Sequence, residues 1–103
     1  MYVLNIWHTV SDFAEWKKTF DADPLGREAS GVRRYSIERP LDAEHQVVGQ
    51  LEFESRAEAE AFAVRLDELW KGEGSRLVSG TGHRITEVVE QGRLGGSTAR
   101  RAA

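Results

Sequence analysis

The chain has 103 residues and a formal net charge of −3, and its 40% hydrophobic and 30% charged residues are typical of one globular domain. It has no cysteine, which excludes disulfide bonds, thiolate nucleophiles and cysteine-ligated metal centres. Without the three arginines after Gly92, 11 basic residues oppose 17 acidic ones, a net charge of −6. A body this acidic argues against nucleic acid as a partner, because phosphate neutralisation needs clustered cations.

The chain divides into one predicted domain, residues 1–91, and a tail, residues 92–103, rich in glycine, alanine and arginine. The composition of the tail predicts flexibility, with docking on a partner subunit as the alternative. No apolar run approaches the ~18 residues of a membrane span, and the N-terminus lacks a basic-then-apolar signal. We therefore expect a cytoplasmic protein with no membrane partner.

Residues 2–10 alternate in the manner of a strand, with Leu4 and Ile6 on one face and Asn5 and Trp7 on the other. A helix is predicted over residues 12–22, because a capping box precedes an apolar stripe at helical spacing, formed by Phe13, Trp16 and Phe20. Asp23-Pro24 ends that helix, since a residue before proline avoids the α region.

Two further strands are predicted over residues 32–39 and 45–54, separated by a loop that begins at Pro40. Ser55 and Glu58 form a second capping box, which opens a helix over residues 56–71. Its apolar residues follow helical spacing: Ala59, Phe62, Ala63, Leu66, Leu69 and Trp70. Four glycines make residues 72–82 an irregular connection, and a last strand is predicted over residues 84–90.

The order β-α-β-β-α-β predicts an α+β, ferredoxin-like domain with an antiparallel sheet. Its two helices cover one face of the sheet, and parity assigns to this layer Leu4, Ile6, Tyr35, Ile37, Leu51, Phe53 and Ile85. The opposite layer then holds Val3, Asn5, Trp7, Thr9, Arg34, Ser36, Val48, Gln50, Glu52, Thr86 and Val88. Such a mixture of apolar and polar groups indicates a covered face, either by a second subunit or by a ligand cavity between two subunits.

Arg34 shares this second layer with Asn5, Gln50 and Glu52. A guanidinium on a covered face must be paired, because an isolated buried charge is costly. We expect Glu52 on the neighbouring strand to be its partner, within the subunit or across a dimer.

The three histidines lie on different elements and lack metal-ligand spacing, so we expect no metal site and assign no catalytic residue. His45 is predicted to be solvated, and His8, near a strand end, to be a hydrogen-bonded edge residue. His83 precedes the last strand, where an open cleft would let it act as an acid or base.

Residues 2–90 resemble the dimeric α/β-barrel superfamily, in its antibiotic-biosynthesis-monooxygenase-like group. The resemblance is carried by the run from Gly31-Val32-Arg33-Arg34-Tyr35 to Arg39-Pro40, and by Leu51-Glu52-Phe53-Glu54-Ser55 leading into Glu58-Ala59-Glu60-Ala61-Phe62. It implies a homodimer whose sheets face each other, with ligand cavities between sheet and helices. It also implies activities that range from cofactor-free oxygenation of aromatic polyketides to haem degradation, isomerisation or cyclisation.

The cofactor-free oxygenases of this group place Asn, Trp, Tyr and Arg around the pocket, and the matching residue types here are Asn5, Trp7, Tyr35 and Arg34. The haem-degrading branch needs an axial histidine in the second helical region. Residues 56–71 contain none, so we expect no cofactor. With the polar residues of the second layer and the cleft histidine, the predicted ligand-binding set is Asn5, Trp7, Arg34, Tyr35, Gln50, Glu52 and His83.

Two functions follow as hypotheses. One is a small dimeric barrel that binds a small aromatic metabolite between sheet and helices, or serves a structural role. The other is a cofactor-independent monooxygenase or cyclase acting on an aromatic, polyketide-like substrate, with Trp7 stacking on the ring and Asn5 and Arg34 polarising an oxyanion. The enzyme predicts an enclosed cavity of at least ~300 Å³ with convergent polar groups.

Overall fold

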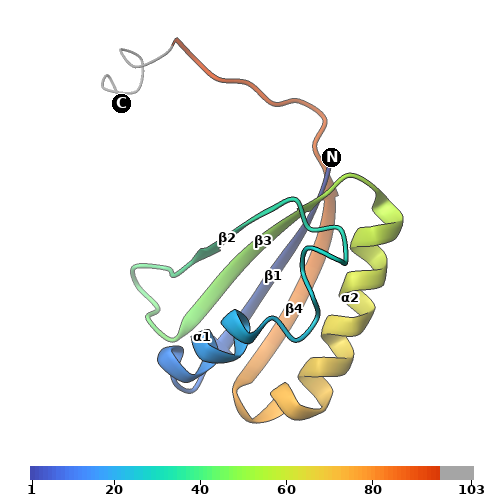
Figure 1. Ribbon diagram of the computed structural model, residues 1–103. Coiled ribbons are helices and arrows are strands. Elements are labelled where there is room, and N and C mark those ends of the chain that lie inside the picture. The colour runs from blue at the N-terminus through green and yellow to red at the C-terminus, as the bar shows by residue number, and fades with distance from the viewer. Residues whose placement is uncertain (96–103) are drawn as a thin grey trace.

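The computed structural model describes residues 1–95 (Figure 1). The elements follow the predicted order: β1 (Tyr2–Val10), α1 (Phe13–Ala22), β2 (Arg34–Glu38), β3 (Gln46–Phe53), α2 (Arg56–Lys71), the short 3-10 helix η1 (Glu73–Arg76) and β4 (Val78–Glu87). The predicted α+β, ferredoxin-like arrangement is confirmed. Within residues 1–95 no helix is both long and apolar enough to cross a membrane.

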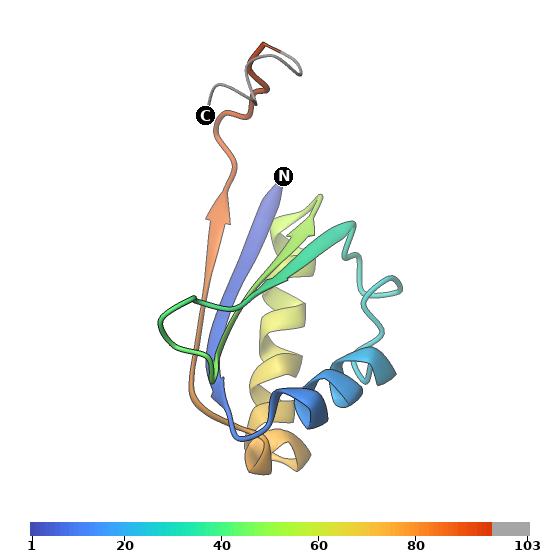
Figure 2. The ribbon, with the colours of Figure 1, turned by 90° about the vertical axis from the view of Figure 1, so that its left-hand side faces the viewer.

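The four strands form one antiparallel sheet in the order β2-β3-β1-β4, so β1 is an interior strand. Leu4 lies opposite Leu51 on β3 and Ile85 on β4, which aligns the apolar positions of the three strands. Both helices lie on the same side of the sheet (Figure 2). We call this side the covered face and the opposite side the open face.

Both predicted N-cap residues start their helices. Oδ1 of Asp12 accepts a hydrogen bond from the backbone N–H of Glu15 at 3.2 Å. Oγ of Ser55 accepts one from the N–H of Glu58 at 3.1 Å and donates to the carboxylate of the same residue at 3.1 Å. The first helix ends where predicted, with Asp23 in the left-handed conformation before Pro24.

The last strand departs from the prediction. It runs from Val78 to Glu87, so half of the segment expected to be an irregular connection belongs to the sheet. Two glycines of this strand have a structural reason. At Gly82 a larger residue would clash, because a Cβ atom there would lie 2.5 Å from the indole of Trp7. Gly80 has a φ of 57° and lies in a β-bulge, where the pairing of β1 with β4 shifts between Trp7 and Thr9.

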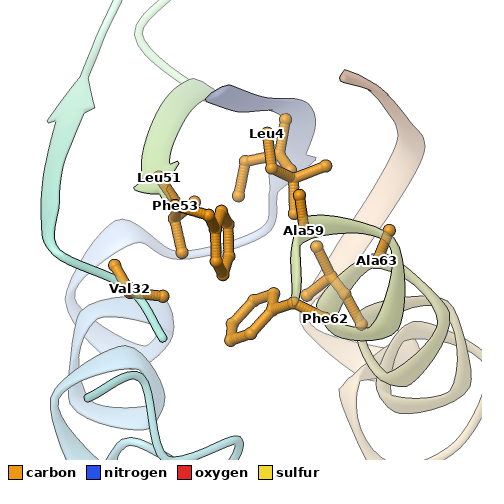
Figure 3. Packing of buried hydrophobic residues seen from close by; sticks show 9 residues of the cluster. Leu4, Val32, Leu51, Phe53, Ala59, Phe62 and Ala63 are labelled. Carbon is orange, nitrogen blue, oxygen red and sulfur yellow. The ribbon is translucent and has the colours of Figure 1, made fainter. Parts of the chain in front are cut away.

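The core lies between the covered face and α2 (Figure 3). Leu4, Leu51 and Phe53 project from the sheet toward Ala59 and Phe62 of α2, and Phe53 is fully buried. A second cluster, under α1, consists of Val10, Trp16 and Val47, against which other side chains pack while partly exposed: Phe13, Phe20, Ile37 and Val78. Residues 96–103 of the predicted tail lie outside the described residues.

Candidate functional site: a pocket between the sheet and the helices

A cavity of about 80 Å³ lies between the covered face and the two helices. We call it the inner pocket. Its walls are mainly apolar and aromatic, formed by Ile6, Trp16, Phe20, Leu51, Phe62, Leu66, Leu69 and Trp70. Small-molecule sites have this composition, provided that a few polar groups converge on the same space.

One deeply buried polar side chain lines the inner pocket, that of His8. It is 3% exposed, and its ring lies 5.3 Å from Trp16 and 5.6 Å from Trp70, measured between ring centroids. Neither Nδ1 nor Nε2 has a hydrogen-bond partner among the described residues. A buried polar group left in this state costs free energy, so its presence calls for an explanation.

The position of His8 follows from local structure. It shares strand parity with Leu4 and Ile6, which aims its side chain toward the helices. On β4, two residues, Gly80 and Thr81, oppose this single residue, because the register shifts there. Bulges of this kind often lie beside functional sites, where they re-aim a side chain.

The apolar surroundings also set the protonation state of this ring. Burial lowers the pKa of His8 to about 4, so the imidazole is neutral at pH 7. A neutral imidazole offers one N–H donor and one acceptor nitrogen. The prediction of a hydrogen-bonded edge residue was wrong, because β1 lies inside the sheet and two tryptophans close over the ring.

The rim of the inner pocket carries the charged pair Arg27 and Asp23. The guanidinium of Arg27 lies 3.8 Å from the ring centroid of Phe20 and 4.9 Å from that of Tyr35. It donates a 2.8 Å hydrogen bond to the carbonyl oxygen of Phe20, and its Nε lies 3.5 Å from Oδ1 of Asp23. These charges are therefore engaged within the chain.

An open groove of about 480 Å³, which we call the outer groove, lies beside the inner pocket, between α1 and the end of α2. The two share the lining residues Thr19, Pro24 and Leu69. Glu15 and Arg76 give the outer groove its charged groups. An apolar pocket therefore borders a groove that carries charged groups.

Five of the seven predicted ligand-binding residues lie together on the open face: Asn5, Trp7, Arg34, Gln50 and Glu52. The amide of Asn5 donates to Oγ1 of Thr86 at 3.1 Å and accepts from Gln50 at 3.3 Å. The predicted pair of Arg34 with Glu52 is confirmed at 3.2 Å. Trp7 is 41% exposed, and within residues 1–95 no segment packs over this face.

The other two predicted residues, Tyr35 and His83, belong to the covered side, at opposite edges of the sheet. Tyr35 stands on β2 against Phe20, and Nε2 of His83 lies 3.0 Å from a carboxylate oxygen of Asp67 on α2. None of the seven residues lines the inner pocket. Their role in ligand binding stays a prediction, and the residue that the pocket does present, His8, was not in the predicted set.

The sequence matches no protein-family model and no curated protein. Solved structures are similar in shape, among them a variant of SnoaB, a cofactor-independent oxygenase from Streptomyces nogalater, at 15% identity. The alignment covers 87% of this chain and 94% of that one, with a TM-score of 0.67. The chain has the ferredoxin-like fold. A dimeric ferredoxin-like protein from an uncultured marine organism is similar at 14% identity, over 90% of this chain and 99% of that one, with a TM-score of 0.64.

A protein from Deinococcus radiodurans classed with the antibiotic biosynthesis monooxygenases is similar at 12% identity, over 93% of this chain and all of that one, with a TM-score of 0.64. The resemblance predicted from the sequence is thereby confirmed at the level of the fold. At identities of 12–15% the likeness is one of fold.

The size of the inner pocket constrains what it can hold. Drug-sized ligands occupy ~300–1,000 Å³, and the inner pocket offers about 80 Å³. A neutral His8 has a ring nitrogen suited to haem iron, yet a porphyrin is far too large for this space, so haem does not fit. The pocket also falls short of the enclosed volume and convergent polar groups that the enzyme hypothesis predicts.

Proposed function

We propose that the protein binds a small aromatic molecule in the inner pocket. The observation that carries this proposal is the side chain of His8, buried at the aromatic wall of the pocket with both ring nitrogens unpartnered. A ligand that hydrogen-bonds this imidazole removes the cost of the unmade bond, and its apolar body gains contact with Trp16 and Trp70.

Binding fits the chemistry of the pocket better than catalysis does. An effective general base has a pKa near the working pH, and burial lowers the pKa of His8 to about 4. The imidazole is then a good hydrogen-bonding group and a weak base. The charged residues that line the pocket, Arg27 and Asp23, are already engaged with each other and with the backbone.

Filling the inner pocket tests this proposal. Leu69 lines the pocket, so Leu69→Phe places extra ring atoms in a space of about 80 Å³. Val64 lies on the same helix, is 60% exposed and lines no part of the pocket, so Val64→Phe is the matched control. Isothermal titration calorimetry with toluene, p-cresol and indole should show saturable binding of at least one compound to the wild type and to Val64→Phe, and at least tenfold weaker binding to Leu69→Phe.

Two results would contradict the proposal. Equal binding to Leu69→Phe and Val64→Phe would place the ligand elsewhere. No heat of binding for any of the three compounds, with a folded protein by circular dichroism, would leave the inner pocket without a ligand role.

We also propose that the protein forms a homodimer through the open face, as a dimeric α/β barrel. Trp7 stands exposed there beside Asn5, Gln50 and Thr86, whose side chains hydrogen-bond one another. The similar marine protein is described as dimeric, which supports the same arrangement here. Burial of this face would also enlarge a core that is small for a chain of 103 residues.

Sedimentation equilibrium tests the dimer. The wild type should sediment at twice the 11.6 kDa mass of the chain, and Trp7→Glu should sediment as a monomer, because it places a charge in the middle of the interface. Val64→Glu, on the outer side of α2, is the control and should remain dimeric. A wild type that stays monomeric at 100 μM would refute the proposal.

The second candidate function is cofactor-independent oxygenation of an aromatic substrate, which the fold likeness to SnoaB favours. In this reading Asn5 and Arg34 polarise a developing oxyanion. The amide hydrogens of Asn5 already point at Thr86 and two backbone carbonyls, which argues against that role. An oxygen electrode decides the matter with a polycyclic aromatic ketone as probe: we expect no consumption above buffer, and consumption that Asn5→Ala abolishes would establish the enzyme instead.

A further inference from the structure

We infer that the ligand of the inner pocket is a neutral phenol with a single ring, whose hydroxyl group hydrogen-bonds His8. This inference rests on the proposed function and specifies the chemical class of the ligand. It is drawn from the size of the pocket, from its one deeply buried polar side chain and from the charges that surround it.

Size limits the ligand to one ring. An engineered apolar cavity of about 150 Å³ is known to hold benzene. The inner pocket measures about 80 Å³ and borders the outer groove, with which it shares Thr19 and Leu69. At about half the volume of that engineered cavity, the inner pocket takes no more than one ring, with part of the ring outside the enclosed space. Two fused rings would have to displace the side chains of Trp16 or Trp70.

Hydrogen bonding selects a hydroxyl group. Neutral His8 carries one donor and one acceptor nitrogen, both buried and unpaired, and the tautomer decides which nitrogen is the donor. A hydroxyl group donates and accepts, so it can pair with the imidazole in either tautomer. A plain hydrocarbon leaves the ring nitrogens unpaired.

Charge selects a neutral ligand. A carboxylate such as benzoate would bring a negative charge into the apolar pocket beside an uncharged imidazole. The cation at the rim, Arg27, is held by the carbonyl oxygen of Phe20 and lies beside Asp23. A phenol is uncharged at pH 7, because its pKa is near 10.

Water is a poorer occupant than a phenol. A buried water molecule typically makes about three hydrogen bonds. The walls of the inner pocket are mainly apolar, and His8 is the one deeply buried polar side chain that a water molecule could hydrogen-bond there. A phenol makes the same hydrogen bond and covers the faces of Trp16 and Trp70 with its ring.

The experiment compares four probes by isothermal titration calorimetry at pH 7: p-cresol, toluene, benzoate and 2-naphthol. Toluene has the shape of p-cresol without the hydroxyl group, so their ratio measures the hydrogen bond. We expect wild-type protein to bind p-cresol about tenfold more tightly than toluene. It should also bind p-cresol more tightly than benzoate and 2-naphthol.

His8→Phe retains an aromatic ring and removes both nitrogens, so it should bind p-cresol and toluene equally. His45→Phe is the control, since His45 is an exposed loop residue, and it should keep the wild-type preference. His8→Leu, whose side chain is smaller than that of phenylalanine, serves as the second variant. It should also lose the preference for p-cresol over toluene, so the test does not depend on the folding of a single variant.

The outcomes separate this inference from the proposed function. Three results would overturn the assignment of a phenol while leaving pocket binding intact. The wild type could bind toluene as tightly as p-cresol, or bind benzoate or 2-naphthol more tightly than p-cresol. Both His8 variants could also keep the wild-type preference for p-cresol over toluene. Absence of binding by all four probes to folded wild-type protein would overturn the proposed function as well.

Discussion

The two faces of the sheet differ in whether their polar side chains have hydrogen-bond partners. On the open face, Asn5, Gln50 and Thr86 hydrogen-bond one another, and Arg34 pairs with Glu52. On the covered face, the buried imidazole of His8 has no hydrogen-bond partner among the described residues. Successive residues of β1 alternate between these two faces. The polar residues of the open face are paired with one another, whereas the one buried polar side chain of the covered face is not.

The largest effect should come from the core of the covered face. Phe53 is fully buried against Phe62, so Phe53→Ala should lower the free energy of unfolding by about 3–5 kcal/mol. Val64→Ala, at an exposed position of α2, should change it by no more than ~0.5 kcal/mol. Urea denaturation followed by circular dichroism measures both. Similar values for the two variants would mean that the covered face does not hold the core.

The second largest effect should be a pH dependence that belongs to His8. Burial lowers its pKa to about 4, against 6.5 in the unfolded chain, so the unfolded state binds more protons between these values. Stability is therefore lost as the pH falls from 6.5 to 4, by up to about 3 kcal/mol from this residue.

His8→Leu should lack this component, because leucine does not titrate. Urea denaturation of both proteins at pH 7, 5.5 and 4.5 measures the difference, since carboxylates that titrate in the same range contribute equally to each. Parallel pH profiles would show that His8 is not buried in its neutral form.

The smallest effect should come from the open face. The side chain of Arg34 is 69% exposed, so its pair with Glu52 contributes ~0–1 kcal/mol to folding. Arg34→Ala should therefore shift the free energy of unfolding by less than about 1 kcal/mol in urea denaturation of the Trp7→Glu variant, which we expect to be monomeric. A loss above 2 kcal/mol would show that the open face contributes to the fold of the single subunit.

Most of the fold could be predicted from local signals. The capping boxes at Asp12 and Ser55 and the period of α2 set the helices, and alternation set β1 and β3. The start of β4 could not be predicted, because glycines are typical of turns and only the indole of Trp7 shows why Gly82 belongs in a strand. That contact joins residues far apart in the sequence.

The open face could also be predicted, down to the pairing of Arg34 with Glu52, because strand parity alone decides which side chains share a face. The inner pocket could not. His8 shares parity with Leu4 and Ile6, and this was the available signal that it points into the core. The lack of a hydrogen-bond partner for His8 depends on Trp16 and Trp70, which come from two different helices. It also depends on a bulge in β4 that no sequence pattern predicts.

The three tryptophans allow one direct test of which face binds the ligand. Trp16 and Trp70 line the inner pocket, and Trp7 stands on the open face. In a two-dimensional ¹⁵N–¹H NMR titration with p-cresol, the indole N–H signals of Trp16 and Trp70 should shift saturably together, while that of Trp7 stays in place. A shift of the Trp7 signal with the other two unmoved would place the ligand on the open face and contradict this account.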